Sequence, residues 1–199
     1  MTTSTNGRAI MVQNYDLESA LETLQSGGLI LYPTDTVWSI GCDATNLRAV
    51  GRIRQLKKTD DALGLEILVS SIDMLRRYVA HLHPRIETLL LYHLRPLTVA
   101  YRQGRNLPNS VLDENGQVAI RLVQDEYCRE MITRMGKPLV ATEADLRQGY
   151  YPDNFGAISS DVIERVDYVS KHRRSDKVSA QPSVMARLSP RDELEFLRE

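Results

Sequence analysis

Residues 27–43 combine an apolar run with a polar loop and read Gly27-Gly28-Leu29-Ile30-Leu31-Tyr32-Pro33-Thr34-Asp35-Thr36-Val37-Trp38-Ser39-Ile40-Gly41-Cys42-Asp43. Residues 29–32 predict a short buried strand, because they are apolar and lie between paired glycines and a proline. The loop that follows places two hydroxyl groups around a carboxylate, which is an unusual way merely to turn a chain. Small ligands often bind in loops at the carboxyl ends of strands in α/β proteins, so this segment predicts a ligand site.

Length and composition predict one domain over residues 1–199, with a core at about 14–190 and a flexible N-terminus at 1–13. The formal net charge of −1 gives no overall attraction to polyanions, so contact with nucleic acid would need a local basic patch. Cys42 and Cys128 lack the spacing of metal ligands, and no apolar run approaches the ~20 residues that span a bilayer. We expect a reduced, cytoplasmic protein with no membrane partner.

Hydrophobic periodicity and turn residues predict alternating helices and strands. We expect helices over 17–24, 46–58, 74–78, 84–91 and 125–135, with a short one after Ser159 or Ser160. Strands are expected over 29–32, 65–69, 97–101, 118–122, 138–141, 167–169 and 183–188. Asn115-Gly116 is a strong hairpin signal before one of these strands, and residues 143–156 form a long loop. The pattern predicts an α/β fold with a twisted, mixed parallel and antiparallel sheet flanked by helices.

Further motifs follow the first in a fixed order along most of the chain. They are the helix 46–58, Arg95-Pro96-Leu97-Thr98, Val118-Ala119-Ile120-Arg121, Lys137-Pro138-Leu139-Val140-Ala141-Thr142 and Gln181-Pro182-Ser183-Val184. Together with residues 33–43 they resemble the YrdC/Sua5/TsaC (YrdC/YciO/YwlC) family of threonylcarbamoyl-AMP synthases. The resemblance implies a single YrdC-like domain.

The resemblance also implies a reaction. L-threonine, bicarbonate and ATP, with Mg²⁺, would give threonylcarbamoyl-AMP and pyrophosphate for the t6A modification of tRNA. Such chemistry depends on in-line positioning and on cations that neutralise the departing pyrophosphate. Further partners would be tRNA or double-stranded RNA and downstream tRNA-modification proteins.

The same resemblance assigns candidate site residues. Lys57 and Arg121 would be catalytic. The substrate-binding residues would be Thr34, Asp35, Thr36 and Ser183. The nucleotide-binding residues would be Lys57, Lys58, Thr98, Thr142, Glu143 and Asp145. We expect Thr34, Thr36, Lys57, Arg121 and Ser183 to line one preformed cavity.

Each of these residues also has a structural role open to it. Thr34 and Asp35 follow a proline and suit a turn. Lys57 at a helix end suits the helix dipole. Arg121 alternates with apolar neighbours, which places it either in solvent or in a cleft. His81 and His83 have no third partner for a metal, and residues 171–174 suit either a solvated loop or contact with RNA phosphates.

Three departures from the family wording bear on activity. Lys57-Lys58-Thr59 stands where the family has Lys-x-Arg, Glu143-Ala144-Asp145 where it has Ser-Ala-Asn, and Ser39 where it has glycine. Loss of an arginine removes a bidentate phosphate contact. Two added carboxylates repel a triphosphate unless Mg²⁺ intervenes.

These departures leave three classes of function open. The first is a threonylcarbamoyl-AMP synthase, either active or impaired by the substitutions at the nucleotide site. The second is a catalytically impaired paralogue that acts as a nucleotide-binding or double-stranded-RNA-binding, translation-factor-like module. The third is a scaffold for protein interaction. Pyrophosphate release in the presence of ATP, bicarbonate and threonine separates the first class from the second, and the third predicts binding of neither ATP nor RNA.

Overall fold

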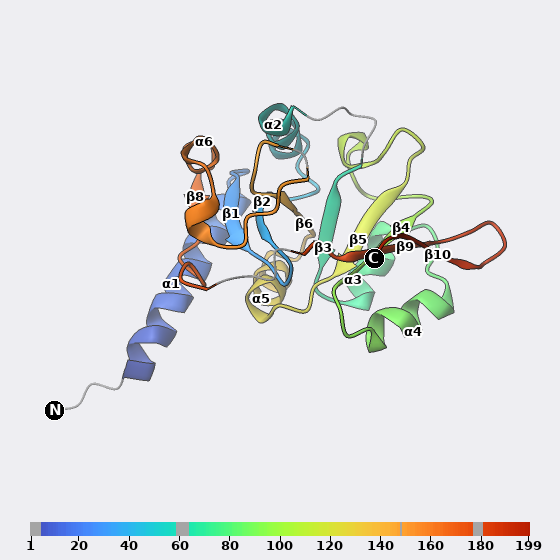
Figure 1. Cartoon of the computed structure of the whole chain (residues 1–199), viewed down its shortest axis with the longest axis horizontal. Coiled ribbons are helices and arrows are strands. Elements are labelled where there is room, and N and C mark those ends of the chain that lie inside the picture. Colours follow the sequence, from blue (N-terminus) through green and yellow to red (C-terminus); the bar gives the residue numbers. More distant parts are fainter. Residues whose placement is uncertain (1–4, 59–63, 148, 177–180) are drawn as a thin grey trace.

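The computed structural model describes residues 5–58, 64–147, 149–176 and 181–199, with side chains described from residue 15 onward. Within these ranges, ten strands form two mixed sheets with six α-helices around them (Figure 1). The mixed α/β class that the sequence predicts is confirmed, although the strands divide between two sheets rather than joining in one.

The smaller sheet is built on the segment 27–43 and has the strand order β7-β2-β1-β8. Strand β1 (Ile30–Pro33) pairs antiparallel with β2 (Trp38–Gly41) and parallel with β8 (Tyr168–Val169). Strand β7 (Thr142–Glu143) pairs with the other edge of β2. The sequence predicts β1 and β8 correctly, but β2 lies within the segment that we expected to be a loop.

The larger sheet has the order β10-β9-β4-β5-β3-β6. Its strands are β3 (Glu66–Val69), β4 (Leu97–Tyr101), β5 (Val118–Leu122), β6 (Leu139–Val140), β9 (Val184–Leu188) and β10 (Leu194–Arg198). Strands β4 and β5 are antiparallel neighbours, but residues 102–117 connect them instead of a two-residue hairpin. Asn115-Gly116 forms only the last turn before β5, where Gly116 has φ +74°.

The two sheets meet where the chain passes directly from β6 to β7. Val140 donates its backbone N–H to the Cys42 carbonyl at 2.9 Å, and Ala141 donates to the Glu66 carbonyl at 2.9 Å. Strand β2 runs so close to this crossing that a Cβ on Gly41 would lie 2.5 Å from the Val140 carbonyl oxygen. Glycine at position 41 therefore allows the sheets to approach each other.

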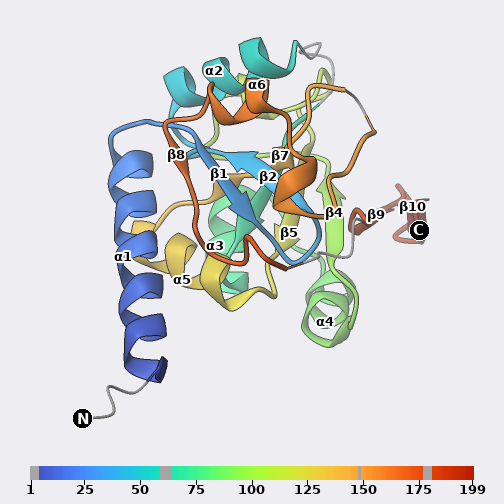
Figure 2. The same cartoon turned by 60° about the vertical axis from the view of Figure 1, so that its left-hand side comes forward.

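The helices are α1 (Thr5–Gln25), α2 (Leu47–Lys57), α3 (Ile72–Tyr78), α4 (Pro84–Tyr92), α5 (Glu126–Met135) and α6 (Ser160–Ile163). Asn46 and Ser71 are the N-caps of α2 and α3, and their side chains accept backbone hydrogen bonds at the starts of these helices. Short 3₁₀ helices cover Asn109–Val111 and Phe155–Ala157. Figure 2 shows α1 running along one side of the molecule, next to α5.

Two ends of the chain differ from the prediction. Helix α1 already begins at Thr5, inside the segment 1–13 that we expected to be a flexible N-terminus. Strand β10 ends at Arg198, beyond the expected core limit of about 190. In the described part of the chain, none of the helices combines the length and the apolar character needed to cross a membrane.

Candidate functional site

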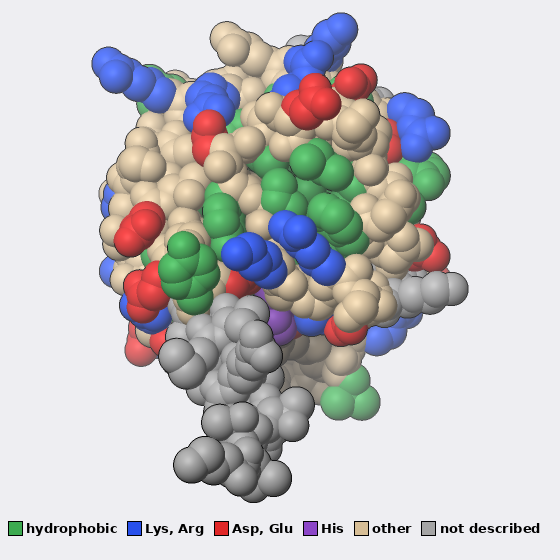
Figure 3. Space-filling view, turned by 90° about the vertical axis from the view of Figure 1, so that its left-hand side faces the viewer, with side chains coloured by type: hydrophobic (Ala, Val, Ile, Leu, Met, Phe, Trp, Pro, Cys, Tyr) green, Lys and Arg blue, Asp and Glu red, His purple; other side chains and the backbone are tan. Residues whose placement is uncertain are grey.

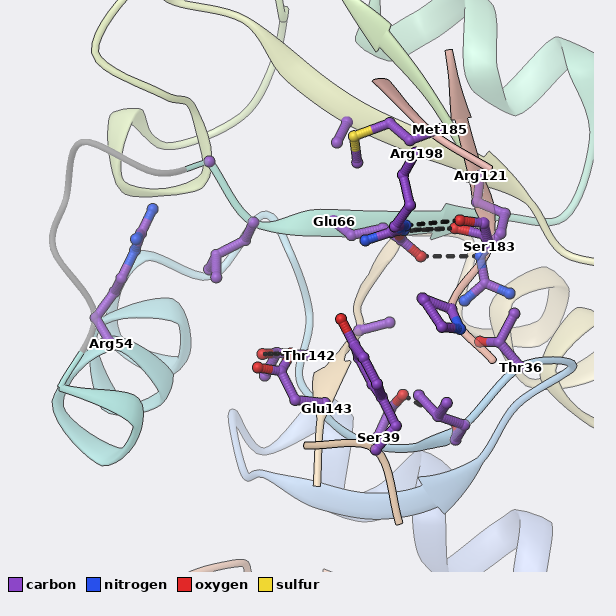
Figure 4. Close-up of a pocket in the computed structure, with 17 residues that line it drawn as sticks. Thr36, Ser39, Arg54, Glu66, Arg121, Thr142, Glu143, Ser183, Met185 and Arg198 are labelled. Atoms are coloured by element: carbon purple, nitrogen blue, oxygen red, sulfur yellow. Dashed lines mark hydrogen bonds and ion pairs between the residues drawn. The ribbon is translucent and has the colours of Figure 1, made fainter. Parts of the chain in front are cut away.

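A cavity of about 280 Å³ opens between the two sheets, beside the turn that joins β1 to β2. Hydroxyl groups of Thr36, Ser39, Thr142 and Ser183 belong to residues in its wall. Figure 4 shows Arg121, Glu66, Ser183 and Arg198 close together at one end, whereas Arg54 and Glu143 lie toward the other. The cavity thus brings together segments that are up to 162 residues apart in the chain, from position 36 to position 198.

Arg121 on β5 lies fully inside the protein, with 1% of its surface exposed. Its Nε donates to Glu66 Oε1 at 2.8 Å, and Nη1 pairs with Asp35. Burial alone would lower the pKa of this guanidinium, but the carboxylates of Glu66 and Asp35 outweigh burial and raise it. The arginine therefore stays charged and holds a fixed position in the cavity wall.

A hydrogen-bonded network continues from Glu66 across the larger sheet. Thr98 on β4 donates to Glu66 Oε2 at 2.9 Å and lies 2.6 Å, oxygen to oxygen, from the Ser183 hydroxyl. Arg198 donates to the Ser183 hydroxyl at 3.1 Å and to its carbonyl at 2.8 Å. Thr98 itself is buried behind the cavity, outside the wall, so its hydroxyl orients Glu66 and Ser183.

The turn residues Thr34 and Asp35 hold the loop in place. The Thr34 hydroxyl accepts from the backbone N–H groups of Thr36 and Val37 and donates to the Val37 carbonyl at 2.8 Å. Asp35 accepts from the Gln124 N–H at 2.9 Å in addition to pairing with Arg121. Of Thr34, Asp35 and Thr36, only Thr36 lies in the cavity wall, so the expectation that Thr34 lines the cavity is wrong.

Lys57 also lies behind the cavity wall, and its ammonium group already binds acceptors of the protein itself. It donates to the Glu143 carbonyl at 3.0 Å and to the Asp145 carbonyl, and it forms an ion pair with Glu143 Oε1 at 3.1 Å. The Lys57 side chain is only 1% exposed. The expectation that Lys57 lines the cavity is therefore wrong, since these three acceptors use all three donors of the ammonium group.

Of the remaining candidates for the nucleotide site, some line the cavity and others do not. Thr142 and Glu143 line the cavity. Asp145 instead accepts from Arg147 at 2.8 and 2.9 Å, and this ion pair holds its pKa below the usual range. Lys58 is exposed at the end of α2 with φ 50°, and Thr59 lies outside the described residues. Each carboxylate of the segment 143–145 therefore has a cation of this chain beside it, and the binding of Mg²⁺ stays a prediction.

Among the charged and hydroxyl-bearing residues of the wall, four were not identified as site residues from the sequence: Arg54, Glu66, Tyr151 and Arg198. Glu66 carried a usable signal, because it is the single charged residue in the apolar run Leu65 to Val69. Arg54 on α2 is buried and donates to the Ser110 carbonyl at 2.8 Å. Arg198 gave no signal, because its position depends on β10 pairing with β9.

The part of the chain that the structure describes contains no preformed cluster of metal-ligating side chains. No three His, Cys, Asp or Glu side chains there are grouped closely enough to hold an ion. His81 and His83 approach each other edge to face, with ring centroids 6.3 Å apart.

The basic segment 171–174 is tied to the protein surface. Arg173 pairs with Asp125 at 3.1 Å and donates to the Thr34 carbonyl at 3.3 Å, while Arg174 lies over the ring of Phe155. On the face seen in Figure 3, basic and acidic side chains are interspersed around a hydrophobic patch. That face shows no continuous basic surface among the described residues, and RNA binding stays a prediction.

The family model named Sua5_yciO_yrdC, described as "Telomere recombination", matches residues 22–199. The chain belongs to this family. Among curated relatives, a threonylcarbamoyl-AMP synthase of Xanthomonas euvesicatoria pv. vesicatoria is 33% identical over 139 residues, which cover 68% of this chain and 74% of that protein. A relative of the same name in Xanthomonas campestris pv. campestris is 27% identical over 157 residues, or 77% of this chain and 84% of that protein.

Solved structures show the same fold. P. abyssi Sua5 complexed with L-threonine matches with a TM-score of 0.81 at 21% identity, covering 92% of this chain and 53% of that one. E. coli YciO matches with a TM-score of 0.80 at 19% identity, covering 94% of this chain and 89% of that one. The chain thus spans about half the length of the Sua5 protein and most of YciO. The family resemblance inferred from the motifs is confirmed.

Proposed function

We propose that this chain binds L-threonine in the cavity and condenses it with bicarbonate and ATP to form threonylcarbamoyl-AMP and pyrophosphate. The observation that carries the proposal is the meeting of Thr36, Arg121 and Ser183 in one cavity from three distant segments. The names of the curated relatives and the threonine complex of Sua5 support the choice of substrate.

The charges in the wall suit a zwitterionic amino acid. Arg121 and Arg198 supply guanidinium groups for a carboxylate, and Glu66 lies between them to receive an ammonium or carbamate N–H. The hydroxyls of Thr36 and Ser39 offer hydrogen bonds to the substrate's own hydroxyl. Because Asp35 and Glu66 fix Arg121, the ligand would meet a preorganised guanidinium, which lowers the entropic cost of binding.

The nucleotide would occupy the end of the cavity near Thr142 and Glu143. There the Glu143 carboxylate holds the Lys57 ammonium, so a phosphate would gain Lys57 only after this carboxylate turns away. Glu143 is 24% exposed and has room to rotate toward solvent. The residues form no protein-only metal site, so Mg²⁺ would enter with the ATP phosphates, and we derive no catalytic step from it.

The ion pair between Lys57 and Glu143 also favours a second candidate function. If Glu143 keeps Lys57 permanently occupied, the chain would bind the amino acid without adenylating it. It would then be a catalytically impaired paralogue that senses or presents its ligand.

Pyrophosphate release distinguishes the two functions. Purified protein is incubated with ATP, bicarbonate and L-threonine, and pyrophosphate is measured against a reaction that lacks threonine. Threonine-dependent release that disappears in Arg121→Lys, and persists in the surface variant Arg134→Lys, supports synthesis. Threonine binding without release supports the second function, and the absence of both contradicts the proposal.

A further inference from the structure

Arg173 lies outside the cavity wall but is attached to the turn that carries Thr36. Its Nη1 donates to the Thr34 carbonyl oxygen at 3.3 Å and pairs with Asp125 Oδ2 at 3.1 Å. Asp125 is the N-cap of α5, so the arginine links a helix end to the turn between β1 and β2. A side chain that is 139 residues away in the sequence thus holds the backbone of this turn.

The backbone of Arg173 is itself strained. Its φ is +54°, in the left-handed region that residues with a Cβ seldom adopt. The residues on both sides are anchored, because the His172 ring stacks on the Tyr127 ring with centroids 4.3 Å apart and Arg174 donates to the Ser170 carbonyl at 2.7 Å. Strained residues that their surroundings hold in place in this way are typical of functional positions.

The turn passes the position of Thr34 on to Thr36. The Thr34 hydroxyl donates its proton to the Val37 carbonyl at 2.8 Å, so its contact with the Thr36 hydroxyl, at 3.0 Å, uses the Thr36 proton. The Thr36 hydroxyl therefore keeps its acceptor lone pairs for a ligand in the cavity. A rotation of the Thr34 backbone would move this acceptor, because the Thr36 N–H also donates to the Thr34 hydroxyl, at 3.1 Å.

We propose that Arg173 is a positioning residue that fixes the Thr36 acceptor and thereby sets the preference for an amino acid with a β-hydroxyl group. The inference rests on the proposed function, since it concerns how the same cavity selects L-threonine. The substrate hydroxyl donates to Thr36, whereas Arg121 binds the carboxylate that every amino acid carries. Arg121 keeps its own ion pairs, so loss of Arg173 weakens recognition of the hydroxyl and leaves recognition of the carboxylate in place.

L-2-aminobutyrate is the matched probe, because it is L-threonine without the hydroxyl group. Both amino acids are titrated calorimetrically into the full chain. We expect the parent to prefer L-threonine about tenfold, since the analogue leaves the Thr36 acceptor unpaired. In Arg173→Met the preference should fall to about threefold or less, while the affinity for L-2-aminobutyrate stays within about twofold of the parental value. A general loss of folded protein would reduce the binding of both amino acids equally and would not change their ratio.

Three further variants sharpen the test. Arg173→Gly should behave like Arg173→Met and should fold, because glycine suits the positive φ and removes the guanidinium. Arg173→Lys should restore the preference, since one nitrogen makes both bonds in the parent and an ammonium group can replace it. Asp176→Asn is the control and should keep the parental preference, because Asp176 is 52% exposed and pairs with Nε of Arg173, not with the nitrogen that holds the turn.

Amide hydrogen exchange follows the turn without a ligand. The N–H groups of Thr36 and Val37, which donate to the Thr34 hydroxyl, should exchange at least about tenfold faster in Arg173→Met than in the parent. A parental preference for L-threonine in Arg173→Met and Arg173→Gly would overturn the proposal, and faster exchange alone would then show that Arg173 merely stabilises the turn. Failure of the parent to bind either amino acid would instead contradict the proposed function itself, and the inference with it.

Discussion

Replacing Glu143 by glutamine tests whether this carboxylate blocks the nucleotide end of the cavity. The parent side chain pairs with Lys57 at 3.1 Å and accepts from the Thr142 hydroxyl at 3.2 Å. Glutamine has nearly the same shape and keeps an acceptor oxygen, but it removes the negative charge. The variant should therefore be less stable when free and should bind ATP more tightly.

The expected magnitudes follow from burial. Lys57 is 1% exposed and Glu143 is 24% exposed, which places the pair between surface pairs, worth about 0–1 kcal/mol, and buried pairs, whose disruption costs about 3–5 kcal/mol. Because two backbone carbonyls still accept from Lys57, we expect the free energy of unfolding to fall by about 1–3 kcal/mol. Freeing the ammonium for a phosphate should raise ATP affinity about tenfold, which corresponds to about 1.4 kcal/mol.

Urea denaturation measures the stability change, and calorimetry with and without Mg²⁺ measures ATP affinity. Glu126→Gln is the matched control, since that side chain is 92% exposed and its ion pair with Arg129 is 3.9 Å long. The reasoning predicts that Glu143→Gln alone changes both quantities, and that its ATP binding depends less on Mg²⁺ than that of the parent. A Glu143→Gln protein with parental stability and parental ATP affinity would refute it.

Predictions for three further variants concern the framework of the fold. Asp16 accepts hydrogen bonds from three side-chain hydroxyls and two backbone N–H groups, so Asp16→Asn should lower the free energy of unfolding by about 3 kcal/mol in urea titrations. Burial opposes ionisation of this carboxyl, but its hydrogen bonds outweigh burial and lower its pKa in the folded protein. The stabilisation that Asp16 gives is therefore complete above the ordinary pKa of about 3.9 and is lost as the pH falls through the lower pKa of the folded state. Asp16→Asn should lose this pH dependence of stability. Gly41→Ala would force a Cβ to within 2.5 Å of the Val140 oxygen and should destabilise the protein by about 1–3 kcal/mol. Gly51→Ala, on α2 with no atom within 4 Å of the new Cβ, should stabilise it by up to about 1 kcal/mol, and a melting curve that ranks these two variants the other way would contradict the packing at the sheet crossing.

Local signals predict the helices and most strands, because each carries its own pattern. Asn46 and Ser71 mark helix starts by capping chemistry, and the end of α5 is marked by Gly136 with φ +71°. Strands β2 and β10 lacked such a pattern. Strand β2 is fully buried and only four residues long, and β10 is the edge strand of its sheet, where it pairs with β9.

The sequence likewise predicts only part of the candidate site. Thr36, Arg121 and Ser183 could be predicted from the family motifs, and they do meet. The sequence does not reveal which polar side chains face the ligand and which support their neighbours. Thr34 supports the turn and Lys57 supports residues 143–145, because nearby carbonyl groups satisfy them first.

Titration of L-threonine into the protein tests the central claim most directly. We predict saturable binding to the parent chain, with affinity lowered at least about tenfold in Arg121→Lys, because lysine cannot bridge Asp35 and Glu66 with a planar guanidinium. Arg134→Lys, at a surface ion pair on α5, should bind like the parent. Absence of L-threonine binding to the parent, or equal affinity in the parent and Arg121→Lys, would contradict the assignment of this cavity as the substrate site.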